Sequence, residues 1–160
     1  MAKPSGDDAV KVVVRNRRAN YQYEILEKIE AGLVLVGSEV KSLRAGKVNL
    51  ADAYATPRGN EVFLLNLHIA PYDHVSFDPP APTRPRKLLL HRRQIGRLIG
   101  KVTERGLTLV PLAIYFRGGV AKVELGLARG KHKYDKRRAI ADRDSKREID
   151  RARAQMERER

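Results

Sequence analysis

A glycine pair between two apolar runs constrains the fold of this chain more than any other feature. The pair, Gly118-Gly119, follows the run LTLVPLAIYF and Arg117, and precedes the run VAKVELGLA. In the second run, apolar side chains alternate with charged or small ones, which is the period of a strand with one buried face. Because adjacent glycines favour the tight turn of a β-hairpin, we predict two long antiparallel strands here.

Further strands are expected on the N-terminal side of this hairpin. The segment 23–36 is typical of one or two strands, and the segments 49–56 and 61–72 predict an antiparallel pair around the turn PRGN at 57–60. Short antiparallel strands with uneven spacing are typical of small barrels. We therefore predict a mainly β fold, an OB-like closed antiparallel barrel of about six strands decorated by short helices.

The first of two predicted short helices covers residues 38–46. Ser38 is the expected N-cap, and the apolar side chains of the segment would face the core while Glu39 and Lys41 would point elsewhere. The stretch 73–87 holds four prolines and is expected to be an exposed loop.

The second predicted helix follows this loop. Its apolar residues Ile95, Leu98, Ile99 and Val102 have the spacing of one helical face. Gly106 is positioned to end the helix.

The chain is expected to divide into three parts: a disordered N-terminus (1–10), the OB-like barrel (11–130) and a basic tail (131–160). The tail holds 12 Lys/Arg against 7 Asp/Glu and few large apolar side chains. Such a composition buries too little apolar surface to fix a fold alone, although its Ala, Arg, Glu and Lys favour helix. We expect the tail to be disordered when free and helical when bound.

The net charge of the chain limits its partners. At +14, it indicates a polyanion: RNA, DNA or an acidic membrane. The chain contains no cysteine, which excludes disulfides and cysteine-ligated zinc. It shows no signal segment and no apolar stretch near the ~20 residues of a membrane span. A cytoplasmic protein without a membrane partner is therefore expected.

Motifs for catalysis, metal binding and nucleotide binding are missing from the sequence. It contains no H-E-x-x-H, G-x-x-x-x-G-K-[ST] or G-x-S-x-G pattern, so we expect no enzyme, metal or cofactor. Glu39 and Asp52 are too far apart in sequence to indicate an acid–base pair. One enzymatic alternative stays open, a metal-independent ribonuclease that would use His91 beside Arg92 and Arg93.

Basic side chains near the expected ends of elements are candidates for phosphate contacts. They are Arg15, Arg17, Arg18, Lys41, Arg44, Lys87, Arg92 and Arg93. From charge alone, a merely solvated surface is the alternative. Glu39 lies within this set. It either accepts hydrogen bonds from a base edge or orients neighbouring Arg or Lys side chains, and the sequence leaves both roles open.

Several stretches, taken in order, are similar to one known family. They are Asn16-Arg17-Arg18-Ala19 with Tyr21 and Tyr23, Glu30-Ala31-Gly32, GSEVKSLRAG at 37–46, Arg86-Lys87-Leu88-Leu89-Leu90, and GKHKYDKR at 130–137. Together they resemble the SsrA-binding protein family, also called small protein B, from about Val14 to the C-terminus. The resemblance implies an OB-like barrel with three helices and no enzymatic activity.

The resemblance also implies a function in bacterial trans-translation. The family binds transfer-messenger RNA (tmRNA) at its tRNA-like domain, promotes its alanylation and helps deliver it to ribosomes stalled on messages without a stop codon. The tail reaches the decoding centre and the vacant mRNA channel. The expected partners are tmRNA, the stalled ribosome with its small-subunit rRNA, and, indirectly through tmRNA, elongation factor Tu and alanyl-tRNA synthetase.

Site residues follow from the same resemblance by position. The RNA-binding set is Asn16, Tyr21, Glu39, Leu89, His91 and Gly130, with the neighbouring cations Arg17, Arg18, Lys41, Arg44 and Lys87. The decoding-centre set in the tail is Lys133, Tyr134, Asp135, Lys136 and Arg137. Tyr134 would stack on an exposed rRNA base, and the two residues after Asp135 would hold phosphate.

The sequence departs from the family pattern at three positions. Ser38 stands where Trp or Thr is common, His91 where Asn is also found, and His132 interrupts a lysine pair. The alternative function is a general OB-fold RNA-binding or ribosome-associated protein, which would bind unrelated RNAs with similar affinity.

Overall fold

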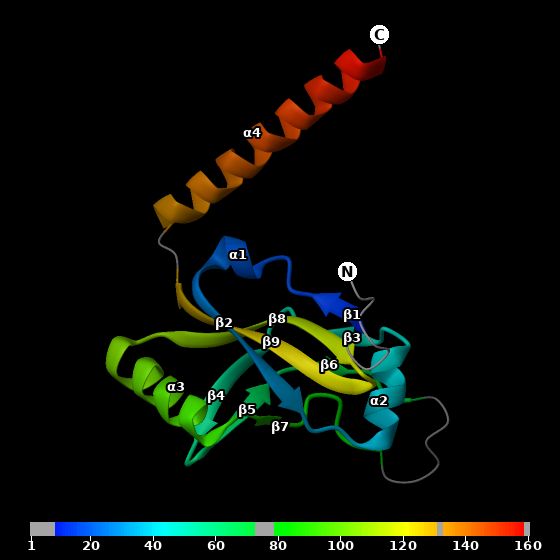
Figure 1. Ribbon diagram of the computed structural model, residues 1–160, viewed down its shortest axis with the longest axis vertical. Helices are drawn as coiled ribbons and strands as arrows, with labels where there is room; N and C mark the ends of the chain where they lie inside the picture. The colour runs from blue at the N-terminus through cyan, green and yellow to red at the C-terminus, as the bar shows by residue number, and fades with distance from the viewer. Residues whose placement is uncertain (1–8, 73–78, 131–132, 159–160) are drawn as a thin grey trace, which may run out of the picture.

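The computed structural model describes residues 9–72, 79–130 and 133–158, with only the backbone described for 133–139. Within these residues the chain forms nine strands and four helices (Figure 1). The strands are β1 (Val10–Arg15), β2 (Tyr23–Leu33), β3 (Val48–Asn49), β4 (Tyr54–Arg58), β5 (Glu61–Leu65), β6 (His68–Ile69), β7 (Arg86–Leu89), β8 (Thr108–Arg117) and β9 (Val120–Gly130). The helices are α1 (Ala19–Gln22), α2 (Gly37–Arg44), α3 (Arg92–Arg105) and α4 (Lys133–Arg158).

The predicted glycine hairpin is confirmed. β8 and β9 pair antiparallel from Arg117 opposite Val120 at the turn to Thr108 opposite Ala128 at the far end. Both turn glycines have positive φ, +57° and +78°, as the tightest hairpin turns require.

Replacing Gly119 with Ala is expected to lower the free energy of unfolding by about 1–2 kcal/mol, because a Cβ disfavours its φ of +78°. No heavy atom lies within 4 Å of the added Cβ, so the backbone alone causes the loss. Gly96→Ala is the matched control. Its site is equally open, but it lies inside α3, where Ala is favoured over Gly by about 1 kcal/mol. Urea unfolding should show a lower free energy of unfolding for Gly119→Ala and a higher one for Gly96→Ala. A Gly119→Ala protein as stable as the wild type would contradict this account of the turn.

The sheet closes into a barrel, which confirms the predicted mainly β, OB-like architecture. The strands neighbour one another in the order β8-β4-β5-β7-β2-β9, and β9 returns to β8. β1 extends the sheet along β8, while β3 and β6 form a separate two-stranded ladder. Inward-facing aliphatic side chains fill the interior, among them Val62, Leu64, Leu88, Leu109, Val123 and Leu125.

The predicted stripe of α3 packs on the barrel. Leu98 is fully buried, and Ile95 and Val102 pack against the core. The helix ends at Gly106, whose φ is +63°. A polar clamp adds to this packing, because Glu27 of β2 forms ion pairs with Arg97 (2.6 Å) and Lys101 (3.4 Å) of the helix.

The prediction for α2 was right in place and wrong in detail. The helix begins at Gly37, after Val36 rather than after a capping Ser38. Leu43 is buried and Lys41 is exposed, as expected. Glu39 is only 3% exposed and points inward, which corrects the expectation that it faces away from the core.

Several strand boundaries also differ from the predictions. Residues 50–53 lie outside the strands, and the backbone N–H of Ala53 donates to the carbonyl of Leu50 in a turn. The run 61–72 is broken at Asn66, whose φ is +59°, so it gives β5 and β6 instead of one strand. β1, which the sequence did not predict, begins at Val10, within the expected disordered segment; residues 1–8 lie outside the described residues.

The tail leaves the barrel as α4, whose N-terminal end lies beside α1 and whose axis leads away from the sheet (Figure 1). Its helical backbone agrees with the helix propensity of its Ala, Arg, Glu and Lys. From residue 141 to 158 every side chain is exposed, including Ile149 and Met156. From residue 141 onward the helix thus has no apolar face packed on the barrel, and the loss of this helix in free solution stays a prediction.

Candidate nucleic-acid interface

The structure divides the predicted RNA-binding residues of the barrel into two groups. The α1 group holds Asn16, Arg17, Arg18, Tyr21 and Gly130; the α2–β7 group holds Glu39, Lys41, Arg44, Lys87, Leu89 and His91. β2 connects them, because its Tyr23 pairs with Gly130 and its Gly32 with Leu89. These nine residue steps correspond to roughly 30 Å along an extended strand. The two groups therefore lie at different ends of β2.

Asn16 fixes the turn between β1 and α1. Its backbone N–H donates to the carbonyl of Leu112 (2.7 Å), and its side-chain Nδ2 donates to the carbonyl of Pro111 (3.0 Å). Both carbonyls lie at the irregularity in the β8–β9 ladder. Arg17 and Arg18 follow this anchor with exposed side chains. Asn16 thus positions the cations of the α1 group.

Gly130 closes β9 next to this group. It is exposed, and a Cβ added to it would meet no heavy atom within 4 Å. The described barrel therefore gives no steric reason for a glycine at this position.

Glu39 is the centre of a buried ion network. Its carboxylate accepts hydrogen bonds from Nε of Arg86 (2.8 Å), from Nε of Arg84 (3.1 Å) and from the backbone N–H of Val36 (3.0 Å), and it is also bonded to Nη2 of Arg84. Arg86 is fully buried and donates further to the carbonyls of Leu67 and Pro82. Glu39 therefore ties α2 to β7 and to the proline-rich segment before it.

These contacts hold Glu39 ionised. Burial raises the pKa of the carboxyl group, but hydrogen bonds from Arg84, Val36 and Arg86 outweigh burial, and the pKa lies below its ordinary value. Of the two roles that the sequence left open for Glu39, the geometry favours the orientation of arginines, since both carboxylate oxygens are occupied.

The cations of the α2–β7 group lie on its outer surface. Lys41 Nζ lies 5.4 Å from the centre of the Tyr72 ring, and Arg44 lies 4.6 Å from that of Phe116. Such cation–π contacts orient a side chain while leaving its donors available. Lys87 forms an exposed ion pair with Glu61 (2.8 Å), which is worth little in water.

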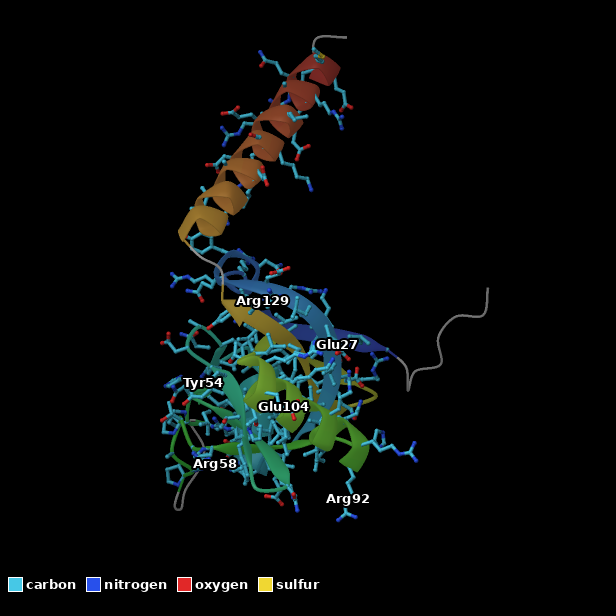
Figure 2. The ribbon with its side chains drawn as sticks, turned by 90° about the vertical axis from the view of Figure 1, so that its left-hand side faces the viewer. Glu27, Tyr54, Arg58, Arg92, Glu104 and Arg129 are labelled. Atoms are coloured by element: carbon cyan, nitrogen blue, oxygen red, sulfur yellow. The ribbon has the colours of Figure 1, made fainter. Side chains whose placement is uncertain are left out.

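Leu89 and His91 line a shallow pocket beside the start of α3. Leu89 is 55% exposed and lies against Gly32, where an added Cβ would approach to 3.1 Å from the Leu89 Cβ. His91 precedes α3, and its backbone N–H donates to Oε1 of Gln94 (3.1 Å). Figure 2 shows Arg92, the next residue, pointing away from the barrel.

Glu30 lines the same pocket. Its carboxylate accepts hydrogen bonds from the Tyr115 hydroxyl and from Arg117 (3.1 Å). Burial and the Glu30 carboxylate raise the pKa of Tyr115 to about 12. Because Glu30 is committed to these two groups, it does not supply the acid–base partner that a ribonuclease built on His91 would need.

The predicted decoding-centre residues lie in the first turns of α4. The backbone of Lys133, Tyr134, Asp135, Lys136 and Arg137 is helical, and their side chains lie outside the described residues. Their roles therefore stay predictions.

Two arginines of this interface were missed by the sequence-based prediction of the site. Arg84 lies in the proline-rich loop, where no periodicity indicates its direction. Arg86 corrects the expectation that the whole stretch 73–87 is an exposed loop, because β7 begins at Arg86 and this side chain is fully buried. Its spacing of two residues from Leu88 indicates the shared face. Within the described residues, His, Asp and Glu form no group of three that could hold a metal.

A closed antiparallel barrel with exposed arginines and lysines at both ends of one strand belongs to the class of small barrels suited to polyanions. Comparisons with known proteins define the class further. The family model described as "SmpB protein" matches residues 13–155. The chain therefore belongs to the SmpB family.

Curated relatives agree with this assignment. An SsrA-binding protein of Anaeromyxobacter sp. (strain K) is 59% identical over 92% of this chain and 91% of its own length. One from Myxococcus xanthus is 56% identical over 91% and 90%. A solved structure described as "tmRNA-SmpB: a journey to the center of the bacterial ribosome" matches with a TM-score of 0.63 and 53% identity, over 79% of this chain and 93% of that one.

Proposed function

We propose that this protein is an RNA-binding factor of trans-translation that binds tmRNA at its tRNA-like domain. The observation that carries this proposal is the extent of the family match, 13–155, which includes both the barrel and most of α4. Relatives named for binding SsrA RNA share both parts. The exposed cations of the α1 and α2–β7 groups supply the phosphate contacts that such binding needs.

The two parts of the chain have different tasks in this proposal. The barrel holds tmRNA, promotes its alanylation and accompanies it to the stalled ribosome, where elongation factor Tu and alanyl-tRNA synthetase act on the RNA and not directly on this protein. The tail enters the decoding centre and the empty mRNA channel. At 1.5 Å per residue, the 26 residues of α4 reach about 40 Å from the barrel. A polar helix of this length suits an rRNA-lined channel.

A reconstituted translation system tests this function. A message without a stop codon is translated with charged tmRNA and with or without the protein, and tagged peptide is measured. Tagging should depend on the protein. Equal tagging in its absence would contradict the proposal.

One observation favours a second candidate, a general RNA-binding protein. Arg15, Arg17 and Arg18 form no ion pair with an acid among the described residues, and such cations bind any phosphate backbone. Selectivity for tmRNA over other RNAs distinguishes the two functions.

Within the described part of the chain, no helix combines the length and the apolarity that crossing a bilayer requires.

A further inference from the structure

A pocket beside the α1 group joins two residues of that group, Asn16 and Arg18, to residues that the family resemblance does not single out. Its lining includes Asn16, Arg18 and Gln22 together with Asp52 and Tyr54. These residues come from distant parts of the chain, the β1–α1 segment and α1 on the one hand, and the turn before β4 and the start of β4 on the other. The pocket is open to solvent at the side of the barrel, where Tyr54 is labelled in Figure 2.

Within the part of the chain that the structure describes, most polar side chains of this pocket have no partner. Among the described residues, the side chains of Arg18, Gln22 and Asp52 form neither a hydrogen bond nor an ion pair. Asn16 uses Nδ2 to hold Pro111, and its Oδ1 accepts no hydrogen bond from the described residues. Tyr54 keeps 39% of its surface exposed and its hydroxyl unbonded. The pocket therefore combines a partly exposed aromatic ring with hydrogen-bond donors and acceptors around it.

Among these side chains, the unpaired carboxylate of Asp52 says most about the chemistry of the ligand. In a chain of net charge +14 that binds polyanions, an acid in a binding pocket repels phosphate. A carboxylate only accepts hydrogen bonds, so Asp52 needs a ligand with N–H donors. Guanine presents two adjacent donors, its N1–H and its N2 amino group, which match the two oxygens of one carboxylate. Adenine and cytosine each present one amino group, and uracil presents a single N–H.

The remaining pocket groups fit the same base. An arginine pairs with the O6 and N7 acceptors of guanine, and Arg18 lines the same pocket as Asp52. An exposed aromatic ring can stack on a base of any kind, and Tyr54 supplies such a ring. Bases recognised in this way are unpaired, since their Watson–Crick edge must be open.

We propose that the pocket between α1 and the turn before β4 binds an unpaired guanine of an RNA partner, with Asp52 on the Watson–Crick edge, Arg18 on the opposite edge and Tyr54 stacked on the ring. The inference rests on the proposed RNA-binding function and adds base selectivity to it.

Short RNAs of defined sequence test the proposal on the full-length protein. Fluorescein-labelled pentamers UUGUU, UUIUU, UUAUU and UUUUU are titrated to millimolar protein at physiological salt, and anisotropy is measured. Inosine lacks only the N2 amino group of guanine. UUGUU should bind about tenfold more tightly than UUIUU, and the adenine and uracil pentamers should bind more weakly still.

Asp52→Asn separates recognition from general electrostatics. Removing an acid from a basic protein should by charge alone strengthen the binding of every RNA. The proposal requires the opposite for guanine: about tenfold weaker binding of UUGUU, with UUUUU unchanged or tighter. Glu104→Gln removes the same charge from an exposed site on α3 and should not weaken UUGUU. Tyr54→Leu should weaken all four pentamers, and Tyr54→Phe should restore them.

The results decide between this inference and the function on which it rests. Equal affinity of the wild-type protein for UUGUU and UUIUU would overturn the guanine pocket, as would no binding of any pentamer or an Asp52→Asn protein that behaves like Glu104→Gln. The tRNA-like domain of tmRNA is titrated in the same assay. If it binds while the pentamers show no base preference, the pocket fails and the proposed function stands; if it does not bind, the function fails as well.

Discussion

Removal of residues 131–160 is expected to abolish peptide tagging on stalled ribosomes while leaving tmRNA binding within about threefold of the full-length value at physiological salt. The barrel closes without the tail, because β9 ends at Gly130 and completes its ladders with β2 and β8. Beyond α1, α4 makes few contacts with the barrel, and from residue 141 its described side chains are exposed. The truncated protein should therefore keep its fold and both groups of barrel cations.

The measurement pairs a tmRNA titration with the reconstituted tagging reaction. Circular dichroism and thermal unfolding first establish that the barrel is intact. A full-length protein with Tyr134, Lys136 and Arg137 changed to Ala controls for tail length and should also fail in tagging. Loss of tmRNA binding by a folded truncated protein would show that the tail takes part in RNA binding and would end the proposed division of tasks.

Glu39→Ala is expected to cost about 3–5 kcal/mol of the free energy of unfolding, because it leaves the fully buried Arg86 without its carboxylate. The free energy of unfolding of small domains is about 5–15 kcal/mol, so this substitution would remove a large part of the stability of the protein. Glu61→Ala is the matched control. It removes a carboxylate from an exposed ion pair with Lys87 and should cost less than about 1 kcal/mol. Equal effects in urea unfolding would contradict the account of Glu39.

The stabilisation by Glu39 should depend on pH with a defined sign. Its pKa in the folded protein lies below the ordinary value of 4.5, so the unfolded chain takes up a proton first as pH falls. The contribution is complete above about 4.5 and is lost as pH falls through the folded pKa. The difference in stability between wild type and Glu39→Gln should accordingly shrink from pH 7 to about pH 3. A constant difference would mean that the carboxylate is not what stabilises this site.

Glu39→Ala should weaken the binding of tmRNA more than the binding of generic duplex RNA. Both affinities are measured under conditions where the wild-type and the Glu39→Ala proteins are folded. Glu39 holds the strand and the helix that carry Lys41, Arg44 and Lys87. A change in their arrangement affects a shaped RNA surface more than simple charge attraction. Equal loss on both RNAs would confine Glu39 to stability.

Local sequence patterns predicted the elements whose cause is local. The Gly118-Gly119 turn and the apolar stripe of α3 follow from backbone conformation and periodicity. The turn is present, and of the stripe Ile95, Leu98 and Val102 pack on the core. Glu39 was misplaced because a charged residue on an amphipathic helix is normally assigned to solvent. Its burial depends on Arg86, which stands 47 residues further along the chain, and no local pattern contains that information.

Some features of the candidate site could likewise be predicted from the sequence, and others depend on the three-dimensional fold. Motif resemblance supplied the residues of the α1 and α2–β7 groups, but their positions at different ends of β2 follow from strand register. Asp52 and Tyr54 carry no sequence signal of their own. They line one pocket with Arg18 because β4 lies beside β8 in the closed ring, next to the anchor that Asn16 makes with Pro111.

The central claim is that this protein selects tmRNA rather than RNA in general, and a competition assay measures this most directly. Full-length protein is bound to labelled tRNA-like domain at physiological salt and then challenged with unlabelled tRNA-like domain or with bulk tRNA. The account predicts that bulk tRNA must exceed the specific competitor by more than about tenfold to displace half of the label, since phosphate contacts alone do not discriminate between RNAs. Displacement by both competitors at the same concentration would contradict the account and identify a general RNA-binding barrel.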